Sequence, residues 1–132
     1  MPQKSSRPPI VIAETEVERL DRLARRAVDS NPEVADELMI ELERAQVCSA
    51  PAVPDNVVRM NSLVEFQTDA GSRLTLRLVY PEDANIAGGC ISILTPVGAA
   101  LIGLSVGQVM TWKDLMGRDR TLKIISVQND LS

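Results

Sequence analysis

The spacing of the apolar residues changes character at one point in the chain, the segment CSAPAVP over residues 48–54, which contains two prolines. Before this segment, apolar residues recur every three or four positions, as on one face of an amphipathic helix. After it, they alternate with polar residues, as in strands that bury one face. Because proline interrupts regular elements of both kinds, the segment separates a helical part from a β part. This pattern predicts an α+β protein, and 132 residues suffice for one domain with a small appendage.

The helical part is predicted to be an antiparallel coiled-coil hairpin. Two segments, about 14–28 and 32–47, carry apolar residues at the spacing of a coiled-coil seam. The link between them, DSNP over residues 29–32, is so short that the two helices must fold back on each other. The expected seam consists of Val17, Leu20, Ala24, Ala27, Ala35, Leu38, Leu42 and Ala45.

Residues suited to capping stand at both expected helix starts. Thr15 with Glu18 is spaced as a capping box for the first helix. For the second helix two possibilities are open: Ser30 with Glu33 as a capping box, or Asn31 as the cap with proline at the first helical position. Both choices place the start of the second helix at about residue 32.

The β part is predicted to form an antiparallel sheet with one short helix. An extended run over 57–67 should turn back onto 74–78, and 109–115 should pair with 121–127. A third strand over 90–94 leads into the stretch LTPVGAALIGLSV. Thr95 as cap and Pro96 at the first helical position predict a two-turn helix there, ended by a glycine.

Charge and composition narrow the classes of function. A net charge of −4 and a pI near 4.8 argue against binding nucleic acid through its phosphates and favour a protein partner. The chain has no histidine, which excludes Ser-His and Cys-His nucleophiles, and it is predicted not to be an enzyme. Cys48 and Cys90 lack metal-ligand spacing, so they are interpreted as reduced and structural, and neither a metal nor a cofactor is expected.

The ends of the chain and its surface give further expectations. Residues 1–9 are predicted to be a disordered tail without the apolar core of a signal peptide, and no apolar run is long enough to span a membrane. A cytoplasmic protein without membrane contact is therefore expected. The small seam residues leave little apolar area for a second copy, which favours a monomer. Arg19, Arg22, Arg25 and Arg26 are interpreted as a solvated, salt-bridged face, with contacts to a partner's acids or to nucleic acid as the alternative.

Five short motifs follow one another in a specific order: IVI at 10–12, ELERAQ at 41–46, VVRMNS at 57–62, LVYP at 78–81 and PVGAALIGL at 96–104. Together they resemble the regulator of nucleoside diphosphate kinase family. That family is related to the Gre transcript-cleavage factors, whose C-terminal domain is FKBP-like. The resemblance implies a short hairpin over 10–50, an FKBP-like domain over 51–132, binding of RNA polymerase near its secondary channel, and an influence on nucleoside diphosphate kinase.

The candidate contact residues form two groups. Asp29, Glu33 and Asp36 belong, together with Glu37, to an acidic cluster at the expected hairpin tip, and the Gre factors use such a tip to help hold a catalytic magnesium ion. The alternative is that acids in the first turns of a helix only complement its dipole. The second group is Leu94, Thr95 and Pro96, since in the Gre factors the loop that enters this helix faces the polymerase.

The expected function is therefore that of an RNA polymerase-binding transcription regulator, which acts by occupying the secondary channel in competition with Gre-type factors. One alternative is a Gre-like transcript-cleavage factor with an acidic tip. Another is direct binding and regulation of nucleoside diphosphate kinase. A prolyl-isomerase function is disfavoured, because one Phe, one Trp and one Tyr are too few to line a proline pocket.

Overall fold

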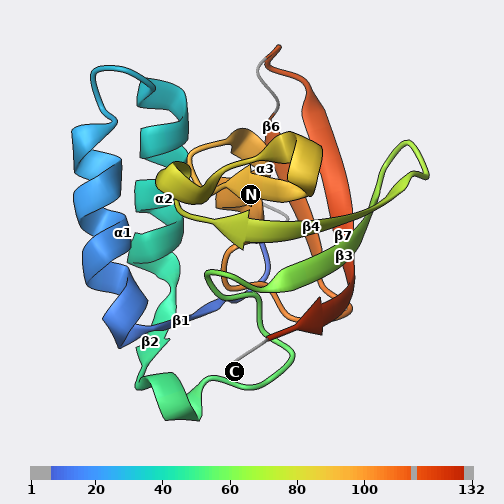
Figure 1. Cartoon of the computed structure of the whole chain (residues 1–132), viewed down its shortest axis with the longest axis horizontal. Coiled ribbons are helices and arrows are strands. Elements are labelled where there is room, and N and C mark those ends of the chain that lie inside the picture. The colour runs from blue at the N-terminus through green and yellow to red at the C-terminus, as the bar shows by residue number, and fades with distance from the viewer. Residues whose placement is uncertain (1–6, 114–115, 130–132) are drawn as a thin grey trace, which may run out of the picture.

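In the computed structural model of the protein, which describes residues 7–113 and 116–129, a pair of helices stands beside a curled sheet (Figure 1). Helices α1 (Glu14–Arg26) and α2 (Pro32–Arg44) run antiparallel and form the predicted hairpin. The sheet and the short helix α3 (Pro96–Leu101) follow in the chain. The predicted α+β class, a helical hairpin followed by a β domain, is confirmed.

A small parallel sheet closes the base of the hairpin. Strand β1 (Val11–Ala13) precedes α1, and strand β2 (Gln46–Cys48) follows α2 and pairs with β1. The backbone N–H of Val11 also donates to the carbonyl of Gly103, 3.2 Å away, so this sheet is attached to the turn after α3. The sequence analysis did not predict these two strands.

The predicted caps of the hairpin helices need correction. Helix α1 begins at Glu14, directly after β1, with Ala13 in the cap position, so Thr15 lies inside the first turn instead of capping it. At α2 the cap position is Asn31 and Pro32 is the first helical residue, which agrees with the second of the two alternatives. Among the described residues, however, no side chain makes a capping hydrogen bond to this helix. The Asn31 amide donates instead to the carbonyl of Leu94, 3.3 Å away.

The main sheet has five strands in the order β5-β4-β3-β7-β6. The two predicted hairpins, β3–β4 and β6–β7, are present and antiparallel, whereas β5 pairs with β4 in parallel, so the sheet is mixed. Residues 114–115, which were expected to extend one strand, lie outside the described residues. The strands are β3 (Leu63–Thr68), β4 (Arg73–Val79), β5 (Cys90–Ser92), β6 (Val109–Lys113) and β7 (Asp119–Gln128).

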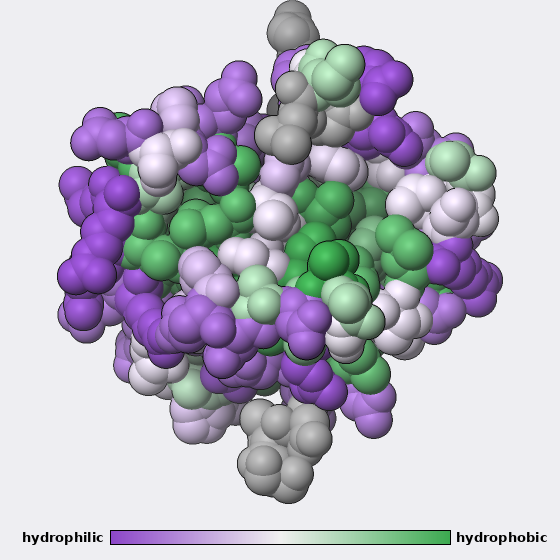
Figure 2. All heavy atoms as spheres, turned by 45° about the horizontal axis from the view of Figure 1, so that its top comes forward, coloured by the Kyte–Doolittle hydropathy of each residue, from purple (hydrophilic) through white to green (hydrophobic). Residues whose placement is uncertain are grey.

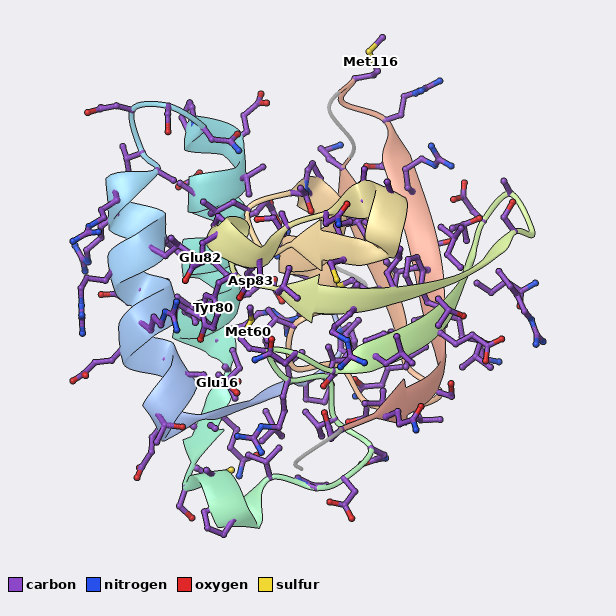
Figure 3. All side chains as sticks on the ribbon, viewed as in Figure 1. Glu16, Met60, Tyr80, Glu82, Asp83 and Met116 are labelled. Atoms are coloured by element: carbon purple, nitrogen blue, oxygen red, sulfur yellow. The ribbon has the colours of Figure 1, made fainter. Side chains whose placement is uncertain are left out.

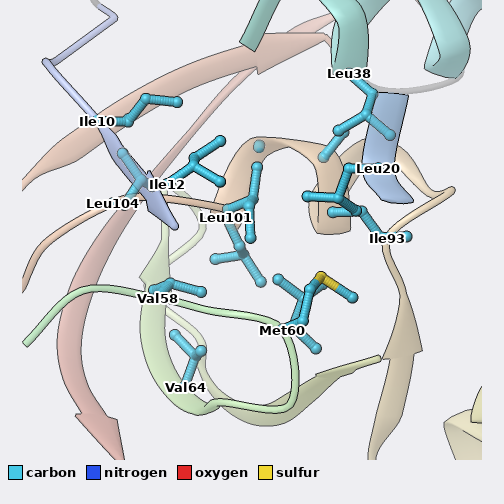
Figure 4. Close-up of a cluster of buried hydrophobic side chains, with 14 of the residues drawn as sticks. Ile10, Ile12, Leu20, Leu38, Val58, Met60, Val64, Ile93, Leu101 and Leu104 are labelled. Carbon is cyan, nitrogen blue, oxygen red and sulfur yellow. The ribbon is translucent and has the colours of Figure 1, made fainter. Parts of the chain in front are cut away.

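One hydrophobic core joins the hairpin to the β domain. Leu20 of α1 and Leu38 of α2 are fully buried, and they belong to the same cluster as Met60, Ile93 and Leu101 (Figure 4). Helix α3 packs against α2 on one side and against β6 on the other. The hairpin therefore does not project as a separate rod, because its apolar face is the surface on which the β domain packs.

Ion pairs attach the start of the described chain to α2. The Arg7 guanidinium contacts Glu37 at 2.9 Å and also pairs with Glu41, whose side chain is fully buried. Arg44 contacts the same Glu41 carboxylate at 2.7 Å, so two guanidinium groups neutralise this buried charge. Of the predicted disordered tail, residues 1–6 lie outside the described residues, and Arg7 is held by these contacts.

Candidate functional site

A groove of about 240 Å³ lies where the tip of the hairpin meets the β domain. Its walls come from α2, from the start of α3, and from β6 with the turn that follows it. Figure 2, which turns the top of Figure 1 toward the viewer, shows hydrophobic side chains in hollows between hydrophilic margins. The groove is lined by Glu33, Val34, Asp36, Glu37, Pro96, Trp112, Lys113 and Gly117.

Helix α2 supplies the acidic wall. Glu33, Asp36 and Glu37 are spaced three and four residues apart, so their carboxylates share one face of the helix. Glu33 and Asp36 are exposed, whereas Glu37 is half-buried and paired with Arg7. Val34 is buried and belongs both to the hydrophobic core and to the inner lining of the groove. Glu33 and Asp36 thus face the groove with no ion-pair partner among the residues that the structure describes.

The opposite wall is the loop that enters α3. The Thr95 hydroxyl accepts a hydrogen bond from the Gly98 N–H at 3.0 Å and donates to the carbonyl of Ser92 at 2.7 Å, which confirms Thr95 as the cap. The amide of Asn31 holds the Leu94 carbonyl from the hairpin side. These bonds fix the loop against the hairpin tip and leave Pro96 on the groove surface.

Strand β6 forms the floor and the cationic end. Met110 is fully buried, and Trp112, two residues on, lies on the same side of the strand. The indole Nε1 of Trp112 is buried and has no hydrogen-bond partner among the described residues. Lys113 pairs with Asp119 of the neighbouring strand at 2.7 Å. The groove therefore offers carboxylates, an indole ring, a proline ring and an ammonium group.

The predicted contact residues divide into three that line the groove and three that do not. Glu33, Asp36 and Pro96 line it, whereas Leu94 and Thr95 shape its wall through their hydrogen bonds. Asp29 is exposed in the turn between the helices and is not part of the lining.

The sequence analysis placed Glu37 in the acidic cluster without naming it as a contact residue, and it missed Trp112, Lys113 and Gly117 as groove residues. The alternation of Met110 and Trp112 in a predicted strand could have placed the tryptophan on the inner face. Within the described ranges, no three carboxylate or thiolate side chains gather so as to hold a metal ion. In the same ranges, no helix is both long and apolar enough to cross a membrane.

Comparison with known protein families divides the chain as its structure does. Residues 8–47 match the family described as Rnk N-terminus, and residues 53–129 match Transcription elongation factor, GreA/GreB, C-term. The first range covers β1, the helical hairpin and most of β2. The second covers the five-stranded sheet and α3.

Individual relatives agree with both matches. The regulator of nucleoside diphosphate kinase of Escherichia coli strain K12 is 37% identical over 124 residues, which are 93% of this chain and 91% of the relative. The transcription elongation factor GreA of Thermodesulfovibrio yellowstonii is 37% identical over 78 residues, 58% of this chain and 49% of that protein. The second match therefore concerns only part of each chain.

A solved structure supports the same assignment. The prokaryotic transcription elongation factor GreA/GreB from Nitrosomonas europaea superposes with a TM-score of 0.72 at 36% identity, and the match covers 91% of this chain and 99% of that one. Both the hairpin and the β domain therefore have their counterparts in one known protein. The chain, which combines an Rnk N-terminal segment with a GreA/GreB C-terminal domain, belongs to the regulator of nucleoside diphosphate kinase family.

Proposed function

We propose that this protein is a transcription regulator that binds RNA polymerase at the rim of its secondary channel. Its relatives carry the names of transcription elongation factors and of a regulator, which supports a regulatory role over an enzymatic one. The protein acts in the cytoplasm by occupying the channel entrance and so competing with Gre-type factors. It makes and breaks no covalent bond.

The observation that carries this proposal is the groove at the hairpin tip. The acidic face of α2 and the entry loop of α3 are far apart in sequence, yet Glu33, Asp36 and Pro96 line one surface. The entry loop is held in place by the Thr95 cap and by Asn31, so the surface is preorganised and loses little entropy on binding. A basic, partly apolar ridge on the polymerase fits these carboxylates and the proline.

The dimensions of the hairpin favour occupancy over transcript cleavage. Each helix has 13 residues, which corresponds to a length of about 20 Å. The tip lies beside the β domain, where Asn31 contacts Leu94, so little of the hairpin extends beyond the domain. With the tip held there, the Asp29 carboxylate stays at the rim when the β domain docks. We therefore expect no stimulation of transcript cleavage.

The link to nucleoside diphosphate kinase rests on the name of the Escherichia coli relative. We infer that the present chain also influences this kinase, either through transcription or by direct contact. A pull-down with purified nucleoside diphosphate kinase in the absence of polymerase separates the two routes. Stoichiometric capture of the kinase supports direct contact, and its absence leaves the transcriptional route.

The groove proposal is tested by reversing one charge in it. Asp36→Lys places an ammonium group in the groove, and we expect the affinity for core RNA polymerase to fall about tenfold through repulsion of a basic ridge. Glu43→Lys is the matched control, because it makes the same charge change at an exposed position of the same helix outside the groove. Equal affinities of the two variants would contradict the assignment of the groove.

A further inference from the structure

A second hollow, of about 290 Å³, lies on the other side of the hairpin, between α1 and the turn after β4. Tyr80 and Glu82 come from this turn, and Figure 3 shows both close to α1. The hollow is polar, unlike the hydrophobic core beneath it. Its lining consists of Arg19, Arg22, Leu23, Arg26, Tyr80 and Glu82.

The net charge of this hollow is opposite in sign to that of the whole chain. Residues 19, 22, 23 and 26 are spaced three, one and three apart, so they share one face of α1. Three arginines therefore surround the hollow, and Glu82 is the one carboxylate in its lining. The chain as a whole carries a net charge of −4. A local excess of two positive charges on an acidic protein indicates a site for an anion.

Arg19 is held in a fixed orientation. Its guanidinium lies over the ring of Tyr80, 3.6 Å from the centroid, and it pairs with Glu82. The tyrosine is itself 8% exposed, so it forms a firm base for the cation. Because Arg19 covers this face of Tyr80, the aromatic ring is not open to stacking with a nucleobase. Recognition in the hollow therefore depends on charge.

Arg22 and Arg26 remain available to a ligand. The contact between Arg22 and Glu18 is 3.7 Å long and both side chains are largely exposed, so the pair is weak. In the part of the chain that the structure describes, no carboxylate oxygen lies within 4.0 Å of Arg26. The neighbouring Arg25 differs, because Asp21 engages it at 2.9 Å and it is not part of the hollow.

We propose that this hollow binds a compact anion with two adjacent phosphate groups. Guanidinium groups bind phosphate oxygens through paired, charge-assisted hydrogen bonds, and the two available ones, Arg22 and Arg26, suit two neighbouring phosphates. The hollow, of about 290 Å³, has room for a diphosphate. The same chemistry is presented by inorganic pyrophosphate and by the diphosphate end of a nucleotide. This binding is independent of the polymerase contact proposed above.

The test is titration calorimetry of the full chain with inorganic pyrophosphate, orthophosphate and a nucleoside diphosphate. We expect pyrophosphate to bind more tightly than orthophosphate, because the hollow is matched to two phosphates. The double variant Arg22→Gln, Arg26→Gln should weaken pyrophosphate binding at least tenfold. Arg25→Gln removes the same charge from the adjacent position of α1 and should leave binding within twofold of the original. Thermal unfolding of all variants verifies that the fold is retained.

The outcomes separate the sources and the alternatives. A nucleoside diphosphate that binds more tightly than pyrophosphate identifies a nucleotide as the ligand, and the reverse order identifies the free anion; both support a diphosphate site. No pyrophosphate binding, or equal losses in Arg25→Gln and the double variant, would overturn the proposal. If a hexaglutamate peptide binds through Arg22 and Arg26 while pyrophosphate does not, the hollow receives an acidic protein segment and the diphosphate assignment is wrong.

Discussion

Glu16 is the residue whose charge is least compatible with its surroundings. It lies on α1 facing the β domain, where it is 13% exposed and its nearest cation is Arg59 at 3.5 Å. One carboxylate oxygen, Oε1, has no hydrogen-bond partner within the described ranges. Burial raises the pKa of Glu16, and this effect exceeds the opposing attraction of Arg59 and a hydrogen bond from the Met60 backbone. The ionised form is therefore disfavoured in the folded protein.

The raised pKa of Glu16 predicts how stability changes with pH. Because the folded pKa lies above the unfolded one, the stability that this group contributes is complete below the unfolded pKa and is lost as pH rises through the folded pKa. Urea unfolding at pH 7 and pH 4.5 should therefore show the original chain gaining stability relative to Glu16→Gln on acidification. Glu14→Gln, an exposed change on the same helix, is the control. If the difference in free energy of unfolding between the original chain and Glu16→Gln is the same at both pH values, this account is contradicted.

Gly98 is required by the close approach of α3 to the strand before it. A Cβ at this position would lie 2.2 Å from the carbonyl oxygen of Ser92, which belongs to the backbone and cannot move aside. Gly98→Ala should therefore lower the free energy of unfolding by about 1–3 kcal/mol. Gly88→Ala is the control, since its new methyl would meet only the side chain of Asn85, and it should cost less than about 0.5 kcal/mol. If the urea unfolding curves of Gly98→Ala and Gly88→Ala have equal midpoints, the argument for Gly98 is wrong.

At the scale of elements, local chemistry was readable from the sequence and long-range pairing was not. The Thr95 cap and Pro96 place the start of α3 correctly, because the bonds that form it lie within four residues. The parallel pairing of β1 with β2 joins residues about 35 apart, and short apolar runs carry no signal of their partner. The same is true of β5, whose parallel pairing with β4 follows the irregular loop between them.

The candidate site was predictable to a similar extent. Glu33, Asp36 and Pro96 were chosen from charge and from the family resemblance, and the structure brings them to one groove. Trp112 was considered only as one of three aromatic residues too few to line a proline pocket, and not as a contact residue. Its position in the groove depends on how β6 packs beside α3, which is a property of the tertiary structure. The basic hollow likewise depends on Tyr80 packing under Arg19.

The docking of the hairpin onto the β domain yields a prediction for the elements together. Leu38 of α2 is fully buried in the core that joins them, so Leu38→Ala should cost about 2–5 kcal/mol. In this variant, the urea midpoint of helix loss, followed by far-UV circular dichroism, and the midpoint of Trp112 exposure, followed by fluorescence, should both fall by the same amount. Ile40→Ala on the same helix is the control, since Ile40 is 40% exposed. Loss of helix at a lower urea concentration than the change at Trp112 would mean that the hairpin folds separately.

At the scale of the whole molecule, the protein is a short hairpin fixed to a β domain, with the two proposed binding surfaces on two sides. The groove at the tip carries carboxylates and a proline, and the hollow on the outer side of α1 carries arginines. The shared core holds both surfaces in a fixed relation. Such a body is suited to filling an opening on a larger partner, because its parts need not rearrange on binding.

The measurement that tests the central claim most directly is binding of the full chain to core RNA polymerase, with and without an excess of a Gre factor. We predict saturable binding that the Gre factor displaces, weakened about tenfold by Asp36→Lys and unaffected by Glu43→Lys. Displacement would place the protein at the secondary channel and support regulation by occupancy. Absence of binding, or binding that a saturating Gre factor leaves unchanged, would contradict the account.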